Sequence, residues 1–281
     1  MPPLYPKMRE RPLEFRINYE APLAEGLVFA GLGGRGCVGS MVFPDSSLYA
    51  NHGTLTNMDA ATDWVWIPEI GEFGLEFSGG QRVTTTFYSS LLDFTASAFF
   101  LATGRDSTPY DRIYCKNYRT GFWMGRVGAA NRWGGGCFNV HDKYVTLTDG
   151  IWHHLALVRS GIHHWNVGDG GRVVSAIMTN SGAPLNSDRP LYIGQENYSL
   201  NRAYFRGQLA RLLLHSRALT PSEISALADP SNVDLRVGGV PLILPPRRRF
   251  WPVAVAEAPP AVQIFSRRQF GPRIGTRQVQ V

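Results

Sequence analysis

Hydrophobic and polar residues alternate most clearly over residues 152–159, where the chain reads Trp-His-His-Leu-Ala-Leu-Val-Arg after a glycine turn. Alternation with a period of two places successive side chains on opposite faces of a strand, so this segment predicts a β-strand with one face on a core. Similar short runs recur along the chain, at residues 26–31, 73–77, 82–86, 97–104, 112–116, 121–127, 191–194 and 209–215. Many short strands between turn residues predict an all-β protein.

Two glycine-rich turns predict β-hairpins. Residues 78–81, Ser-Gly-Gly-Gln, separate the runs at 73–77 and 82–86 and indicate that these two strands pair. Residues 168–171, Gly-Asp-Gly-Gly, give the clearest tight hairpin of the chain. They lie between predicted strands at 162–167 and 172–177.

One helix is expected near the end of the β pattern. Thr220 suits the N-cap, Pro221 the first helical position and Glu223 the capping-box position. The apolar residues Ile224 and Leu227 follow at helical spacing.

The chain has 281 residues, enough for one large β domain with extensions. Prolines 2, 3, 6, 12 and 22 disfavour regular structure at the start, which predicts an extended N-terminal arm over residues 1–22. Residues 23–229 are predicted to form the domain. Residues 230–281 are rich in proline and arginine and predict a second extended arm.

The net charge of +6 is concentrated in the C-terminal arm. Residues 241–281 hold seven arginines and one acid, Glu257, and the remainder of the chain is formally neutral. The run Arg247, Arg248, Arg249, Phe250 and Trp251 could contact phosphate. Because the neutral domain offers no basic groove, we expect this run to dock on another subunit instead and expect no nucleic-acid partner.

Cysteine content and hydropathy bear on the cellular setting. Three cysteines, Cys37, Cys115 and Cys137, argue against a disulfide framework and predict small buried side chains, although a Cys115–Cys137 bridge stays open. No stretch approaches the roughly 18 consecutive apolar residues of a membrane span, so no membrane insertion is expected. The N-terminus has no apolar core of a signal peptide, so we expect none.

Residues 26–228 resemble the laminin-G-like, concanavalin A-like jelly rolls, close to the pentraxin-like branch. Four segments carry the resemblance in the expected order. They are the opening strand at 26–29, the polar loop at 45–55, the strand at 73–77, and the closing stretch from 192, which includes Arg-Ala-Leu-Thr-Pro-Ser-Glu-Ile at 217–224. The resemblance implies a two-sheet antiparallel jelly-roll sandwich with one short C-terminal helix.

The departures from the family pattern concern calcium. The family often has an acidic turn after the strand at 73–77 and acids in its last strand. Here these segments read Ser-Gly-Gly-Gln-Arg at 78–82 and Gly-Gln-Leu-Ala-Arg at 207–211. Because Ca²⁺ needs about six or more oxygen ligands, several of them charged, no cofactor is expected. Asp45, Asp169 and Glu196 are the remaining candidate ligands.

Three further sets of side chains are candidates for chemistry. Aromatic rings that could stack on a sugar are Trp123, Trp133, Tyr118 and Tyr198, with core packing as the alternative. A glycosidase of this fold uses closely spaced carboxylates, for which the candidates are Glu69, Glu72 and Glu76; their irregular spacing disfavours catalysis. The pairs His153–His154 and His163–His164 suggest zinc, but no third ligand has recognisable spacing, so structural histidines are favoured.

These features favour a non-enzymatic structural protein. Laminin-G-like domains usually work outside cells, whereas this chain shows no export signal and an odd cysteine count. A virion protein, made in the host cytoplasm and released by lysis, reconciles the two. We therefore hypothesise a capsid decoration or tail-associated subunit whose arms contact other copies and other virion proteins. The alternative is a carbohydrate-binding, lectin-like module that binds host-surface glycans; a glycoside hydrolase is disfavoured.

Overall fold

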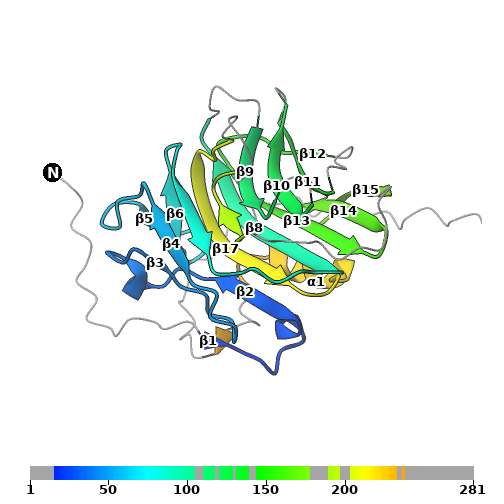
Figure 1. Ribbon diagram of the computed structural model, residues 1–281, viewed down its shortest axis with the longest axis horizontal. Helices are drawn as coiled ribbons and strands as arrows, with labels where there is room; N and C mark the ends of the chain where they lie inside the picture. The colour runs from blue at the N-terminus through cyan, green and yellow to red at the C-terminus, as the bar shows by residue number, and fades with distance from the viewer. Residues whose placement is uncertain are drawn as a thin grey trace, which may run out of the picture. The chain divides into compact units, whose positions relative to one another are not determined.

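The computed structural model describes residues 16–104, 110–117, 120–128, 131–138, 144–177, 189–196, 203–232 and 236–237. Two antiparallel sheets pack face to face, as predicted (Figure 1). In sheet I the order is β12 (Val145–Thr146), β11 (Arg132–Cys137), β10 (Phe122–Val127), β9 (Tyr110–Cys115), β16 (Tyr192–Ile193), β7 (Arg82–Thr85), β4 (Gly53–Thr56) and β3 (Val42–Phe43).

Sheet II contains the strand that the alternating pattern predicts over residues 152–159. Its order is β15 (Arg172–Ile177), β14 (His163–Gly168), β13 (Trp152–Ser160), β8 (Phe94–Ala102), β17 (Gly207–His215), β6 (Glu72–Phe77) and β5 (Trp64–Ile67). β2 (Leu27–Gly31) also pairs with β17. Short helical turns η1 (Pro22–Ala24) and η2 (Arg35–Cys37) flank β2.

The main core lies between the two sheets and is built from large side chains on their facing sides. Phe77, Phe100 and Leu155 reach it from sheet II, and Val83 and Trp133 from sheet I. All five are almost completely buried. Burial of a large apolar side chain contributes about 1.5–3 kcal/mol, so this shared core holds the sandwich together.

The helix α1 (Pro221–Ala228) covers part of the other face of sheet II. Its Ile224 and Leu227 pack with Ala156 and Val158 of β13 and with Leu213 of β17. The predicted capping is confirmed, since the backbone N–H of Glu223 donates to the Thr220 hydroxyl and the Thr220 N–H donates to the Glu223 carboxylate. Because both faces of β13 are covered, its burial is nearly continuous rather than alternating.

One predicted hairpin is confirmed and the other is wrong. β14 and β15 pair across the Gly168–Gly171 turn. The strands β6 and β7 do not pair, because β6 joins β5 and β17 in sheet II whereas β7 joins β4 and β16 in sheet I. Residues 78–81 therefore cross between the sheets. A turn sequence fixes the reversal of the chain but not the partner of each strand, and here Phe77 and Val83 enter one core from opposite sheets.

All three cysteines are buried and free, so a Cys115–Cys137 bridge is not formed. Cys115 on β9 and Cys137 on β11 are separated by the whole of β10. Cys137 belongs to the core between the sheets, and burial raises its pKa to about 12. Its thiol is therefore protonated at neutral pH and acts as an apolar side chain.

Both predicted arms begin next to each other. β1 (Arg16–Ile17) pairs with β18 (Arg236–Val237) in a separate two-stranded sheet. Ile17 is buried with Leu23 and Leu27. Residues 1–15, 233–235 and 238–281 of the two arms, including Arg247, Arg248, Arg249, Phe250 and Trp251, lie outside the described residues. No helix in the described ranges has the length and apolar character needed to cross a membrane.

Candidate functional site

The outer face of sheet I carries the most concentrated group of arginine and aromatic side chains in the described part of the chain. Met124 is in the core, so its neighbours Trp123 and Gly125 face outward on β10. Arg112 shares the outward face because it pairs with Gly125, with Ile113 bulged between Arg112 and Tyr114. The outer face of sheet II is covered in part by α1; on the outer face of sheet I, Arg112 and Trp123 are buried, and Tyr110 is 40% exposed.

We call five residues of this face the sheet I strip: Arg82, Tyr110, Arg112, Trp123 and Tyr192. They come from β7, β9, β10 and β16, which are neighbours in the sheet. The Arg112 guanidinium lies 4.3 Å from the ring centre of Trp123 and 5.3 Å from that of Tyr110. The Arg82 guanidinium lies 5.5 Å from the ring centre of Tyr192. Stacking on rings fixes both guanidinium planes. Arg112 is buried and its Nη1 donates to the carbonyls of Asp111 and Arg126, whereas Arg82 is half-buried.

Two polar residues that follow β16 complete the strip. Gln195 Oε1 accepts a hydrogen bond of 3.3 Å from Arg82, and Glu196 pairs with Arg112 at 3.5 Å. Burial raises the pKa of Glu196, while the charge of Arg112 opposes that shift. The arrangement combines planar polar groups with aromatic rings, a chemistry that suits sugars, which present both hydroxyls and apolar C–H faces.

The aromatic residues predicted from the sequence do not form this surface. Trp133 has an exposed fraction of 0% and stacks in the core against Phe100, with ring centres 4.2 Å apart. Trp123 belongs to the strip but is 1% exposed, with the Arg112 guanidinium over its ring. The prediction that these two rings stack on a sugar is therefore wrong; Trp123 supports Arg112 instead. Tyr118 and Tyr198 lie outside the described residues.

Sequence reasoning missed Tyr110, which is 40% exposed, and Tyr192, which is half-buried. A signal was present for Tyr192, because it begins a short strand directly before a core position. Ile193, the residue after Tyr192, is buried in the core. The alternation therefore places Tyr192 on the opposite, outer face.

The remaining acids proposed as calcium ligands have other partners. Asp45 accepts hydrogen bonds from the backbone of Ala30, Ser47 and Asn51 and organises the loop before β4. Asp169 pairs with the ring of His153 at 3.0 Å. Among the described residues no group of three or more His, Cys, Asp or Glu side chains could hold a metal ion.

The four histidines occupy opposite ends of the β13–β14 hairpin, so a cross-strand histidine pair is not formed. His163 and His164 lie at the turn end, where they pair with Ser160 and Arg159. His163 is exposed and His164 is buried, whereas His153 and His154 are both buried. Burial lowers the pKa of His154 to about 3, so this ring is neutral at physiological pH.

The three glutamates considered for glycosidase chemistry do not act together. Glu69 and Glu76 are exposed. Glu72 is fully buried and forms an ion pair of 2.7 Å with Arg211, whose guanidinium also contacts the backbone carbonyl of Pro230. Arg211 is the residue that replaces a family acid in the last strand, and the buried carboxylate of Glu72 balances its charge.

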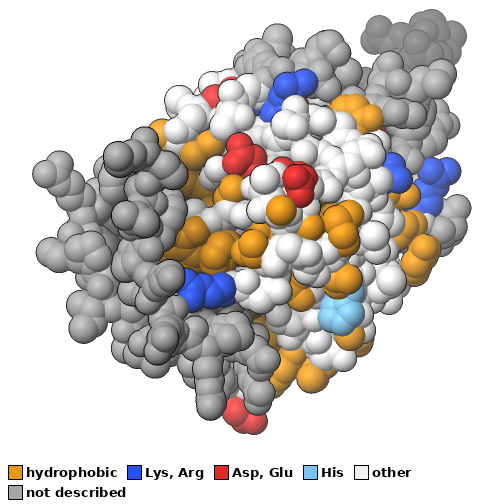
Figure 2. Space-filling model, turned by 90° about the vertical axis from the view of Figure 1, so that its left-hand side faces the viewer, with side chains coloured by type: hydrophobic (Ala, Val, Ile, Leu, Met, Phe, Trp, Pro, Cys, Tyr) orange, Lys and Arg blue, Asp and Glu red, His pale blue; other side chains and the backbone are white. Residues whose placement is uncertain are grey.

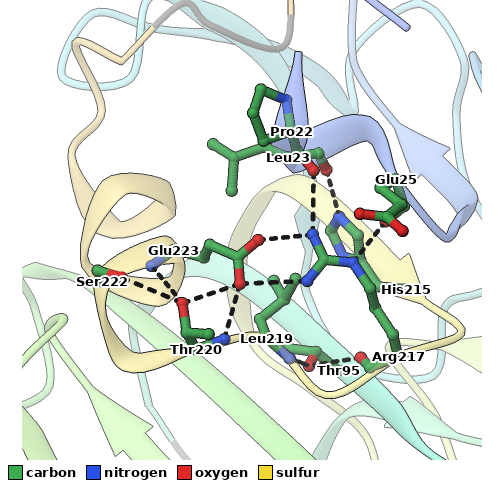
Figure 3. A network of polar contacts seen from close by, with 10 residues as sticks. All are labelled: Pro22, Leu23, Glu25, Thr95, His215, Arg217, Leu219, Thr220, Ser222 and Glu223. Carbon is green, nitrogen blue, oxygen red and sulfur yellow. Dashed lines mark hydrogen bonds and ion pairs between the residues drawn. The ribbon is translucent and has the colours of Figure 1, made fainter. Parts of the chain in front are cut away.

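A network around Arg217 explains the motif at 217–224 (Figure 3). The guanidinium donates to both oxygens of Glu223, at 2.6 and 3.1 Å, and to the carbonyls of Pro22 and Glu25. Glu223 also caps α1 through Thr220. The ion pair lowers the pKa of Glu223 to about 2. One arginine thus joins the N-terminal segment to the start of the helix.

Two buried polar groups extend the network into sheet II (Figure 3). His215 Nε2 lies 2.8 Å from the Leu23 carbonyl, and burial lowers the pKa of this histidine to about 4, so the neutral ring donates this hydrogen bond. The Thr95 hydroxyl donates to the Arg217 carbonyl and accepts from the Leu219 N–H. The network is structural and lies away from the sheet I strip.

A second surface feature lies at the edge formed by β3 and β5. Figure 2 looks onto this side and shows hydrophobic side chains gathered in its centre. The exposed hydrophobic residues there include Val38, Met41, Val42 and Trp66, with Val42 50% and Trp66 44% exposed. A hydrogen bond from the Trp64 indole to the Ser40 carbonyl holds the two segments side by side. We call these four residues the apolar edge.

Several solved structures share the fold of this chain. Domain 4 of AbnA, an extracellular arabinanase from Geobacillus stearothermophilus in complex with arabinotriose, is 17% identical, with a TM-score of 0.52; the match covers 72% of this chain and 98% of that domain. A Trypanosoma rangeli sialidase mutant displaying trans-sialidase activity is 15% identical, with a TM-score of 0.56, over 80% of this chain. These two likenesses show the fold, a two-sheet antiparallel sandwich.

The binding domain of botulinum neurotoxin DC in complex with SialylT is 12% identical, with a TM-score of 0.51, over 74% of this chain. This chain spans only 37% of the sialidase and 52% of the toxin domain. Residues 77–225, more than half of the chain, match the model of the concanavalin A-like lectin/glucanases superfamily, and the chain belongs to this family. Curated protein sequences gave no match.

Proposed function

We propose that this chain is a non-enzymatic carbohydrate-binding module and that the sheet I strip is its binding face. The observation that carries the proposal is the row of stacked guanidinium and tyrosine groups across β7, β16 and β9, with Gln195 and Glu196 beside it. Tyr110 and Tyr192 offer ring area to a sugar, and the polar groups offer paired donors and acceptors to its hydroxyls.

Membership of a lectin/glucanase family supports a carbohydrate as the ligand. The positions of the carboxylates support a function without glycoside hydrolysis. Glycosidases need two facing carboxyl groups, about 5–10 Å apart across the scissile bond. Glu72 is held by Arg211 inside the protein, and Glu196 is paired with Arg112. Two neighbours of the same fold, the AbnA domain and the toxin domain, were solved in complex with arabinotriose and with SialylT, respectively.

A glycan array followed by calorimetry tests this function. We expect binding of at least one glycan class and a loss of at least tenfold in affinity for Tyr192→Ala, because the ring that supports Arg82 and faces the sugar is removed. Tyr49→Ala is the matched control. Tyr49 is exposed on the loop before the first residue of β4, whereas Arg82 pairs with Thr56, the last residue of that strand. An array without binding, or equal losses for both variants, contradicts the proposal.

We propose as a second function that the domain is built into a larger assembly, such as a virion surface, through contacts between copies. Two observations favour it. The apolar edge exposes Trp66 of β5 and Val42 of β3. The first and last described strands, β1 and β18, pair with each other, so the described part of the chain begins and ends at neighbouring strands. Large exposed apolar patches mark interaction sites more often than chance.

The oligomeric state and the particle content test this second function. Light scattering should show an assembly that dissociates in a Val42→Ser, Trp66→Ser variant, whereas a Val173→Ser variant, changed at an exposed position of β15, should not dissociate. Mass spectrometry of the particles from which the chain is isolated should find it with a fixed copy number. A monomer at all concentrations, together with no particle, refutes this role.

A further inference from the structure

Arg82 differs in its partners from four other arginines of the domain. Four arginines in the described ranges have carboxylate partners: Arg112 with Glu196, Arg126 with Asp111 and Asp149, Arg211 with Glu72, and Arg217 with Glu223. Arg82 is half-buried, and its hydrogen-bond partner is the neutral amide of Gln195. Its positive charge is therefore not balanced by an ion pair in the described part of the chain.

The unused hydrogen-bonding edge of Arg82 is well defined. Nη1 donates to Gln195, while Nε is buried and has no acceptor among the described residues. Nε and Nη2 together form the side of a guanidinium that binds a carboxylate with two parallel hydrogen bonds. A buried donor without an acceptor in the protein is uncommon, and it favours this edge as a place for an acceptor group of a ligand.

The surroundings of this edge suit a sugar rather than a simple ion. The Tyr192 ring lies under the guanidinium and fixes its plane. Thr84, two residues along β7, and Thr56, the cross-strand partner of Arg82 on β4, point to the same outer face. Their hydroxyls can bind sugar hydroxyls next to a charged group.

We propose that the sheet I strip recognises an acidic sugar and that Arg82 is the residue that binds its carboxylate. This inference rests on the proposed carbohydrate-binding function and names the chemical class of the glycan. Arg112 has a different role, because its charge is already balanced by Glu196; it holds that side of the strip in place.

Paired glycans that differ only in charge test the inference. Calorimetry compares 3′-sialyllactose with lactose, and a galacturonic acid trisaccharide with its methyl ester, for the native chain and for Arg82→Gln. We expect at least one acidic member to bind more tightly than its neutral counterpart. Arg82→Gln should reduce its affinity about ten- to hundredfold, the worth of a hydrogen bond to a charged group, and leave neutral glycans unchanged.

Two controls separate this inference from a loss of structure and from general charge. Arg132→Gln, on an exposed position of β11 in the same sheet, should keep full affinity. Arg82→Gln should unfold at the same denaturant concentration as the native chain. Equal binding of acidic and neutral glycans, unaffected by Arg82→Gln, overturns the inference while the carbohydrate function stands. Absence of binding to every glycan overturns both.

Discussion

Lys116, directly after β9, should make the stability of this protein depend on pH in the alkaline range. Its side chain is fully buried, and Nζ donates to the carbonyls of Phe87 and Arg189 at 3.0 and 3.4 Å. Nζ also lies 4.5 Å from the ring centre of Phe87. These partners are uncharged, so burial lowers the pKa of Lys116 from 10.5 to about 7.

The sign and size of the effect follow from this pKa. Between pH 7 and 9 the unfolded chain keeps the Lys116 proton, whereas the folded chain loses it. The free energy of unfolding therefore rises with pH by about 1.4 kcal/mol per unit once the pH exceeds the folded pKa. The gain from pH 7 to 9 is roughly 2 kcal/mol. Below pH 7 both states are protonated, and this contribution no longer changes.

Urea denaturation of the native chain and of Lys116→Met, at pH 7, 8 and 9, measures this contribution. The native chain should gain roughly 2 kcal/mol more than the variant over this range, and the variant should be the more stable of the two at pH 7. Lys116→Arg, which keeps its charge throughout, should lose the pH dependence and be less stable at every pH. Parallel curves for the native chain and Lys116→Met refute the reasoning.

Two ion pairs give further predictions. Arg211→Met should cost about 3–5 kcal/mol by leaving Glu72 buried and unpaired, whereas the double variant Arg211→Met, Glu72→Leu should cost clearly less; additive losses in urea denaturation contradict this pairing. Glu223→Gln should lower the free energy of unfolding by about 1–2 kcal/mol at pH 7, after allowing for solvent screening of the pair with Arg217. Because the pKa of Glu223 is lowered from 4.5 to about 2, this difference should persist above pH 4.5 and vanish as the pH falls to 2. Thermal unfolding at several pH values checks it, and a constant difference speaks against the Arg217 contact.

Local chemistry in the sequence was enough for the helix and for one hairpin. Thr220, Pro221 and Glu223 define the start of α1 by their own hydrogen bonds, and the Gly168–Gly171 turn joins strands that pair with each other. These features depend on residues close in sequence. In contrast, β6 pairs with β17, which lies more than 130 residues away in the sequence. No local pattern in residues 78–81 contains that information.

The candidate site was harder to predict for a related reason. Trp123 and Trp133 are both aromatic residues of short strands, yet β10 turns Trp123 outward beneath Arg112 and β11 turns Trp133 into the core. On β9 a bulge leaves Ile113 between the pairs Tyr114–Met124 and Arg112–Gly125, so the face of a residue on that strand cannot be counted from the strand start. The pairing of Arg82 with Tyr192 likewise joins strands distant in sequence.

The pairing of β1 with β18 makes this fold suitable for insertion and permutation. Arg16 and Val237 are direct cross-strand partners, so the described domain starts and finishes within about 6 Å of backbone. Such a unit can be placed in a surface loop of a host protein without separating the ends of that loop. A linker of a few residues between the two strands, with new termini opened at the Gly168–Gly171 turn, should give a permuted chain that folds to the same sandwich.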